Sequence, residues 1–232
     1  MTTSVHLAPS GTRTGTIIAG VAGLLHVILA VIAPALTGEL TQPSWSEPSA
    51  SILDFYQTTA FDTSFMAGVF LEGVAFVVVL VLIAKLSDLV GNAEGGSPWL
   101  GRLIFGGAVL DTALILAYLS TLGAAGFRTS HGGMNADGYL LLNDLRFAFI
   151  WVGLLALVLW LASLGFAMIR TALFPRWLGW AMLVNSATIL IAFFLPVRAW
   201  DITTGLPILW VLVIAVLLLT RPDRYSGRVS HS

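Results

Sequence analysis

Three ionisable side chains lie near the middle of long apolar segments, where a charge is unfavourable. They are His26, Glu72 and Asp111, and Asn185 lies at a similar depth in a later apolar segment. An ionisable group at bilayer depth costs roughly 2.5–3.5 kcal/mol on insertion scales, so its presence indicates a function by default. Buried carboxyl and imidazole groups can relay protons, bind a cation or act as general acids. We therefore take these residues as the candidate ligand-binding or proton-relay site.

Helical spacing predicts which way these side chains point, because residues three, four and seven apart share one face of a helix. Small residues, which permit close helix approach, share the face of each one: Ala19, Gly23, Ala30 and Ala33 with His26, Gly68 and Ala75 with Glu72, and Gly107 with Asp111. All three should therefore face the interior of a helix bundle. We expect the carboxyl groups of Glu72 and Asp111 to be neutral and to lie roughly 4–7 Å apart, with His26 nearby.

Other interpretations of these residues remain open. They could simply hydrogen-bond three helices together, and for His26 alone a satisfied core histidine is the simpler interpretation. A metal site made of His26, Glu72 and Asp111 has enough ligands, but the sequence has no local metal-ligand motif, so no metal is predicted. No nucleophile elbow, phosphate loop or HExxH motif occurs, and the chain has no cysteine. The sequence predicts no cofactor.

A fifth candidate, Arg146, stands at the predicted start of a later apolar segment. In the favoured interpretation Asp144 caps that helix and Arg146 extends outward to the membrane surface. In the alternative, Arg146 turns inward above Glu72 as its counter-charge and gates a path from outside.

The composition is typical of a membrane protein. Hydrophobic residues make up 57% of the chain and charged residues only 10%, whereas soluble domains are about a quarter charged. The mean hydropathy is +0.92. A formal net charge of -1 without a long basic run excludes a nucleic-acid partner, because phosphate binding needs clustered Lys and Arg. The lipid bilayer is the expected partner, and the sequence identifies no protein partner.

Six segments meet the requirement of about 20 mostly apolar residues for a transmembrane helix. They are Thr16 to Leu36, Ser64 to Ala84, Trp99 to Leu122, Leu145 to Ile169, Arg176 to Leu195 and Ile202 to Thr220. The predicted fold class is therefore all-α, a polytopic bundle of six transmembrane helices over residues 16–220, with tails at residues 1–15 and 221–232.

The first segment has an alternative interpretation as a cleaved signal peptide. Arg13 precedes it, and Ala33-Pro34-Ala35 resembles a signal-peptidase site. Its apolar part is longer than the usual 7–15 residues, so an intact first helix is favoured.

The distribution of Lys and Arg predicts the orientation, because basic flanks stay on the cytoplasmic side. With the N-terminus inside, eight basic residues are cytoplasmic and only Arg128, Arg146 and Arg198 lie outside. Tryptophans fall at the predicted boundaries, with Trp99, Trp177 and Trp180 inside. Both termini are therefore predicted to be cytoplasmic.

Two connections are long enough to have structure of their own. In residues 37–63, Ser51-x-x-Asp54 resembles a capping box that opens a short helix on the membrane surface, with Ile52, Phe55 and Tyr56 on one face. An irregular loop containing Pro43 and Pro48 is the equal alternative. Residues 123–138 contain five glycines and are predicted to form a mobile outer loop.

Three short segments resemble an uncharacterised family of bacterial multi-pass membrane proteins, a domain of unknown function. They are SASILDFYQ (residues 49–57), LLNDLRFAF (141–149) and PRWLGW (175–180), in this order between apolar spans. The resemblance extends over roughly residues 49 to 220. It implies six spans and a location in the bacterial inner membrane, and it implies no activity or site residues.

Three functions are compatible with these features. The first is binding or transport of a small lipophilic or cationic ligand at the intramembrane polar cluster. The second is a membrane-embedded enzyme that uses Glu72 or Asp111 as a general acid, and the third is an accessory subunit whose polar groups are structural. A deep cavity that contacts both carboxyls would favour the first two, and a fully packed bundle would favour the third.

Overall fold

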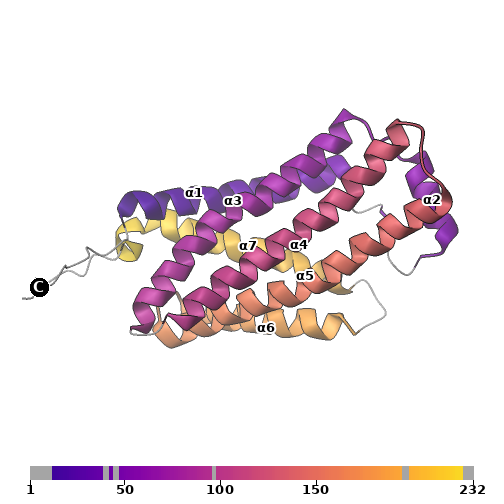
Figure 1. Cartoon of the computed structure of the whole chain (residues 1–232). Helices are drawn as coiled ribbons and strands as arrows, with labels where there is room; N and C mark the ends of the chain where they lie inside the picture. The colour runs from indigo at the N-terminus through magenta and orange to yellow at the C-terminus, as the bar shows by residue number, and fades with distance from the viewer. Residues whose placement is uncertain (1–11, 39–41, 44–46, 96–97, 195–198, 227–232) are drawn as a thin grey trace, which may run out of the picture.

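Every regular element that the structure describes is a helix. The computed structural model describes residues 12–38, 42–43, 47–95, 98–194 and 199–226, with side chains in the last range from residue 204 onward. These residues form seven α-helices, one 3-10 helix and no strand (Figure 1). The helices are α1 (Arg13–Thr37), α2 (Ser49–Thr58), α3 (Thr63–Glu94), α4 (Trp99–Ser130), α5 (Ala136–Thr171), α6 (Arg176–Ala192), α7 (Ala199–Thr220) and η2 (Pro222–Tyr225). The predicted all-α class is confirmed.

The six longer helices form a closed ring. Each packs against the next along the chain, in the order α1, α3, α4, α5, α6 and α7, and α7 packs back against α1. Figure 1 shows them running side by side along one axis, with the start of α1 and the end of α7 at the same end. The ring therefore encloses a central space that side chains from several helices can share.

Glycines set the closest helix contacts in the ring. A Cβ added to Gly165 in α5 would lie 2.7 Å from the carbonyl oxygen of Gly179 in α6, and the reverse contact is also 2.7 Å. On α1, a Cβ at Gly23 would lie 2.9 Å from the Cβ of Ala215 in α7. The small-residue stripe of the first segment is thus a helix-packing surface, as its spacing indicates.

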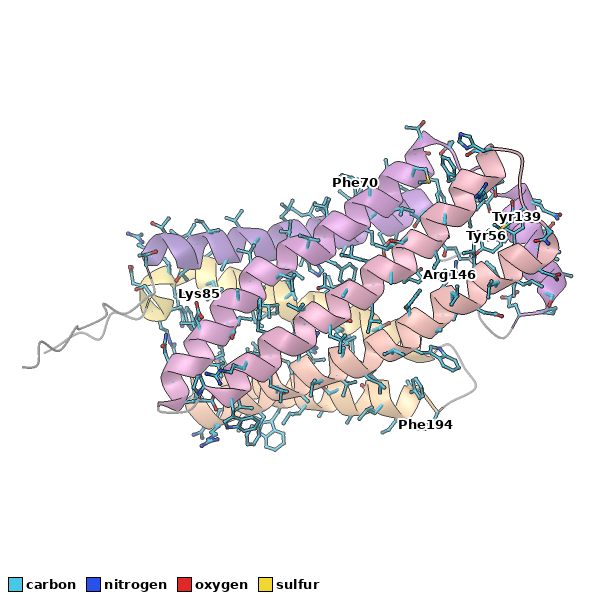
Figure 2. All side chains as sticks on the ribbon, viewed as in Figure 1. Tyr56, Phe70, Lys85, Tyr139, Arg146 and Phe194 are labelled. Atoms are coloured by element: carbon cyan, nitrogen blue, oxygen red, sulfur yellow. The ribbon has the colours of Figure 1, made fainter. Side chains whose placement is uncertain are left out.

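Four helices are long and apolar enough to cross a membrane: α1, α3, α4 and α5. Their outward faces carry large apolar side chains, such as Phe70, which is 69% exposed. Phe194, just after α6, is 81% exposed, and Figure 2 shows both pointing away from the bundle. Apolar surface this extensive indicates a protein that lies in lipid. Of the two remaining long helices, α6 has 17 residues, and the apolar part of α7 whose side chains are described is Thr204–Thr220.

Several helices extend beyond the predicted spans, and one predicted loop is wrong. α3 continues past Ala84 to Glu94, and α4 continues past Leu122 to Ser130, so residues 123–130 are helical. Among the glycines of that segment, Gly126 serves packing, since a Cβ there would lie 2.8 Å from the Phe61 ring. Only residues 131–135 connect α4 to α5. The predicted end of the fifth span at Leu195 lies outside the described residues.

α2 confirms the predicted short helix but not its capping box. The helix begins at Ser49 after Pro48, so Ser51 lies within its first turn rather than before it. No side chain caps the helix. Ile52 and Tyr56 are buried against the ends of α3, α4 and α5. The Tyr56 ring stacks on Tyr139 of α5, with ring centroids 5.2 Å apart. α2 therefore covers the end of the bundle that lies opposite η2 (Figure 1).

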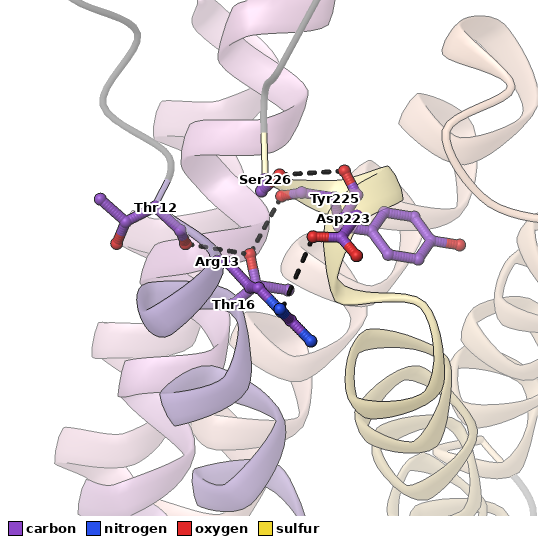
Figure 3. Close-up of polar contacts among 6 residues, drawn as sticks. All are labelled: Thr12, Arg13, Thr16, Asp223, Tyr225 and Ser226. Atoms are coloured by element: carbon purple, nitrogen blue, oxygen red, sulfur yellow. Dashed lines mark hydrogen bonds and ion pairs between the residues drawn. The ribbon is translucent and has the colours of Figure 1, made fainter.

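At the opposite end, η2 ties the last helix to the first. The Thr16 hydroxyl in α1 donates to the Tyr225 carbonyl oxygen at 3.1 Å. The Tyr225 ring stacks on Phe174, with centroids 4.8 Å apart. Arg13 and Asp223 approach to 3.7 Å, but both are largely exposed, so this pair contributes little (Figure 3). Part of the predicted C-terminal tail is thus a packed cap.

Candidate functional site: a cavity at the centre of the ring

The ring surrounds a partly open cavity of about 370 Å³. Its walls come from α1, α3, α4, α5 and α7, and residues 42–43 close one side. Four of the five sequence-predicted site residues line it: His26, Glu72, Asp111 and Arg146. Most of the remaining wall is apolar, formed by side chains such as Val79, Ile115, Ile150, Leu154 and Ile208. Small-molecule sites typically occupy about 300–1,000 Å³ and combine apolar walls with a few polar groups.

His26 reaches the cavity from the middle of α1 and is 6% exposed. Its Nδ1 lies 2.9 Å from the carbonyl oxygen of Ala75 in α3. Since a carbonyl only accepts, we assign the proton to Nδ1, which makes Nε2 the acceptor of a neutral ring. The ring also packs edge-on against Phe76, with centroids 5.7 Å apart. His26 thus joins α1 to α3 and also contributes to the cavity wall.

Asp111 is fixed in position by the next helix. Trp160 of α5 donates its indole N–H to Asp111 Oδ2 at 3.1 Å. Both side chains line the cavity, and Asp111 is 8% exposed. Gly153 of α5 also lines it, and a Cβ there would lie 3.8 Å from Asp111 Oδ1. The absence of a side chain at Gly153 leaves space beside the carboxyl group.

Glu72 contributes the second carboxyl group from α3. It is 8% exposed and lines the same cavity as Asp111. Neither acid therefore faces lipid, as the small residues on their faces indicate. The separation of 4–7 Å between the two carboxyl groups stays a prediction.

Arg146 lies inside the bundle, so the prediction that it extends outward is wrong. It is 2% exposed and lines the cavity. Nη1 donates to Gln42 Oε1 at 2.9 Å, and Nη2 donates to the Pro43 carbonyl oxygen at 3.2 Å. The guanidinium carbon lies 4.7 Å from the centroid of the Phe147 ring and 5.7 Å from that of Tyr118. The inward direction of the alternative is confirmed, and the roles of counter-charge for Glu72 and of gate stay predictions.

The reason for the error is the start of α5. The helix begins at Ala136, where Asn135 Oδ1 accepts from the Gly138 N–H at 3.0 Å, rather than at Leu145. Asp144 is therefore an exposed residue inside the helix and not its cap. Arg146 consequently lies deeper than predicted, beneath α2, and Figure 2 shows it on the side of the bundle where Tyr56 and Tyr139 lie.

The surroundings of Arg146 have unfilled hydrogen-bonding capacity. Among the described residues, Arg146 Nε and both amide atoms of Asn143 are buried without a hydrogen-bond partner. Asn143 is 0% exposed and stands on the same face of α5. Burial raises the pKa of the Tyr56 hydroxyl, and the positive charge of Arg146 opposes part of that rise. This end of the cavity is therefore electropositive and rich in hydrogen-bond donors.

The charged groups occupy different depths. Arg146 faces Tyr118 on α4, and Asp111 precedes Tyr118 by seven residues on the same helix. At the helical rise this places the two α4 positions about 10 Å apart along the axis. The cavity thus has a cation at its α2 end and a carboxyl group deeper inside.

Asn185 is the one predicted site residue outside the cavity wall. It lies on α6, which contributes no wall residue among those described. Its Oδ1 accepts from the Trp210 indole N–H at 2.9 Å and so joins α6 to α7.

The metal alternative receives no support from geometry. Among the residues that the structure describes, no three His, Cys, Asp or Glu side chains are grouped closely enough to hold a metal ion.

Sequence reasoning missed Trp160, Gln42 and Gly153. Arg146, Gly153 and Trp160 share one face of α5, seven residues apart, so a helical projection of that segment could have found two of them. Gln42 lies outside any helix and carries no such signal.

Comparisons with protein-family models, with curated proteins and with solved structures found no match for this chain.

Proposed function

We propose that this protein binds a small lipophilic molecule with a polar group in the central cavity, as a carrier or transporter. The observation that carries this proposal is the cavity of about 370 Å³, where His26, Glu72, Asp111 and Arg146 meet apolar walls. Polar groups that served only to join helices would be expected in a packed bundle without such a space. A purely cationic ligand is disfavoured, because Arg146 shares the cavity.

Acid catalysis in the membrane is the second candidate. It is favoured by the fixed position of Asp111, which Trp160 holds beside the open space at Gly153. Chemical identification of the bound molecule separates the two candidates. A carrier retains its ligand unchanged, whereas an enzyme converts added ligand to a product.

We also propose that α6 and α7 cross the membrane, which gives six spans with both termini in the cytoplasm of a bacterial cell. Their side-by-side course with the four longer helices supports this (Figure 1). A helix of 17 residues is at the lower limit for a span. Trp99, Trp177 and Trp180 are all at least half exposed, as expected for a membrane interface.

The topology can be tested with reporter fusions. A reporter at the C-terminus should be active in the cytoplasm, and one inserted in residues 131–135 should be active outside it. The reason is that basic residues on the C-terminal flank are retained inside. A C-terminus found outside, or both reporters on one side, would contradict the six-span proposal.

Ligand retention can be tested by filling the cavity. We expect the amount of ligand that copurifies with the protein to fall at least tenfold in Gly153→Leu, because the new side chain would occupy the space beside Asp111. The protein would be purified in a mild detergent and extracted with organic solvent, and the extract would be analysed by mass spectrometry.

Gly106→Leu is the matched control. Gly106 is exposed on α4, and among the described residues nothing lies within 4 Å of a Cβ built there. This variant should retain as much ligand as the unmodified protein. If the Gly153→Leu protein folds and gives the same extract as the Gly106→Leu protein, the cavity is not the binding site.

A further inference from the structure

The charge of Arg146 is buried among neutral hydrogen-bond partners. Its acceptors are the amide oxygen of Gln42 and the backbone carbonyl of Pro43. Among the described residues an ion pair is found between Arg13 and Asp223, and none is found between Arg146 and a carboxylate. Removing a cation from water is costly unless it is paired and hydrogen-bonded. The site therefore favours an anion that enters from the cavity.

The guanidinium still has donors to offer such an anion. Arginine carries five N–H donors; the contacts to Gln42 and Pro43 use two of them, and the Tyr56 hydroxyl is a further acceptor beside the guanidinium. Nε has no partner among the described residues. The planar fork of arginine matches the two oxygens of a carboxylate or phosphate. Gln42 and Pro43 hold the fork in place without neutralising it.

The cavity also determines what must follow the anionic group. Tyr118 and Phe147 flank the guanidinium, and beyond them the wall is formed largely by aliphatic side chains toward Trp160. An apolar chain fits these walls, whereas a second charged group would be desolvated among them.

We infer that the ligand is a single-chain amphiphile whose carboxylate or phosphate head binds Arg146 and whose apolar chain lies along the cavity. This inference rests on the proposed binding function and names its ligand class. The head lies at the α2 end, and the chain extends past Glu72 and Asp111. An apolar chain would desolvate an ionised carboxylate, so both acids are expected to be neutral where the chain passes them.

The experiment compares four probes that share one chain and differ in the head: dodecanoate, dodecyl phosphate, dodecanol and dodecylammonium. Binding to the full-length protein in lipid nanodiscs would be measured by native mass spectrometry. We expect dodecanoate and dodecyl phosphate to bind at least tenfold more tightly than dodecanol, and dodecylammonium to bind most weakly. The relative affinity of the first two distinguishes a fatty carboxylate from a lipid phosphate.

Variants assign the preference to Arg146. In Arg146→Gln, the affinities for the other three probes should lie within about threefold of the affinity for dodecanol. Arg146→Lys should keep part of the preference for anionic probes, because lysine retains the positive charge. Arg128→Gln, the same change at an exposed position of α4, should behave as the unmodified protein does.

The outcomes separate this inference from the proposed function. Tighter binding of dodecanol or dodecylammonium by the unmodified protein would overturn the anionic head, while loss of that binding in Gly153→Leu would still support the cavity. The wild-type comparison stands even if Arg146→Gln fails to fold. If the unmodified protein binds none of the probes, the inference fails. If its solvent extract also matches that of Gly153→Leu, the proposed function fails too.

Discussion

Replacing Asp111 by asparagine should lower ligand affinity by about 2–10-fold while the fold stays nearly intact. Asparagine keeps the shape of the side chain, and its carbonyl oxygen can still accept from the Trp160 indole N–H. What is lost is the acidic O–H of the neutral carboxyl group, and a hydrogen bond between neutral groups is worth about 0.5–1.5 kcal/mol. Glu72→Gln should act in the same way, because Glu72 lines the same cavity.

The measurement is a binding titration in nanodiscs with the molecule extracted from the unmodified protein, together with thermal unfolding of each variant. Asp144→Asn is the matched control, since Asp144 is an exposed carboxylate on α5. It should change neither quantity. Unchanged affinity in both Asp111→Asn and Glu72→Gln would make the acids structural. In that case Asp111→Ala should cost about 0.6–2 kcal/mol of stability through the lost bond to Trp160.

A large loss of stability is expected at the contact between α5 and α6. A methyl group added by Gly179→Ala would meet the Gly165 carbonyl oxygen at 2.7 Å and Ile169 Cγ1 at 2.8 Å. Backbone cannot move aside as a flexible side chain can, so the two helices must separate. We expect a loss of about 1–3 kcal/mol for alanine and more for leucine.

Thermal or denaturant unfolding in detergent would measure this effect. Gly106→Ala is the control, because a Cβ at Gly106 meets nothing within 4 Å among the described residues. Its stability should be unchanged or slightly higher, since alanine is the better helix former. Equal stability of the two alanine variants would contradict the close helix contact.

Apolar length and the small residues beside His26, Glu72 and Asp111 predicted much of this structure. Each of these three side chains shares its helix face with small residues that permit close packing. Lipid offers a polar side chain no hydrogen-bond partner, so the side chain turns toward the neighbouring helices. These local patterns are enough to direct all three side chains into the same cavity. The same reasoning applied to Gly20 and Gly23 identifies the face of α1 that packs on α7.

Arg146 shows why the rest could not be predicted. An apolar window measures the thickness of lipid and not the length of a helix, so the polar extensions of α3, α4 and α5 were missed. The position of Arg146 depends on where α5 starts and on Gln42, which is distant in the sequence and outside any helix. Asn185 shows a second limit. The depth of a residue along its helix does not reveal whether its side chain faces the cavity or, as Asn185 does, the indole of Trp210.

The position of α7 has a consequence for biosynthesis. The ring closes only when α7 packs on α1, and α7 supplies Thr204, Gly205, Pro207, Ile208 and Val211 to the cavity wall. At about 5–20 residues per second, the ribosome needs roughly 10–40 s to pass from the end of α1 to the end of α7. During that interval the acids and His26 lack one wall, and the nascent chain presents polar groups laterally to lipid or to the insertion machinery. Packing of the last helix, whose C-terminal extension is fastened by the Tyr225 carbonyl to Thr16, supplies this wall.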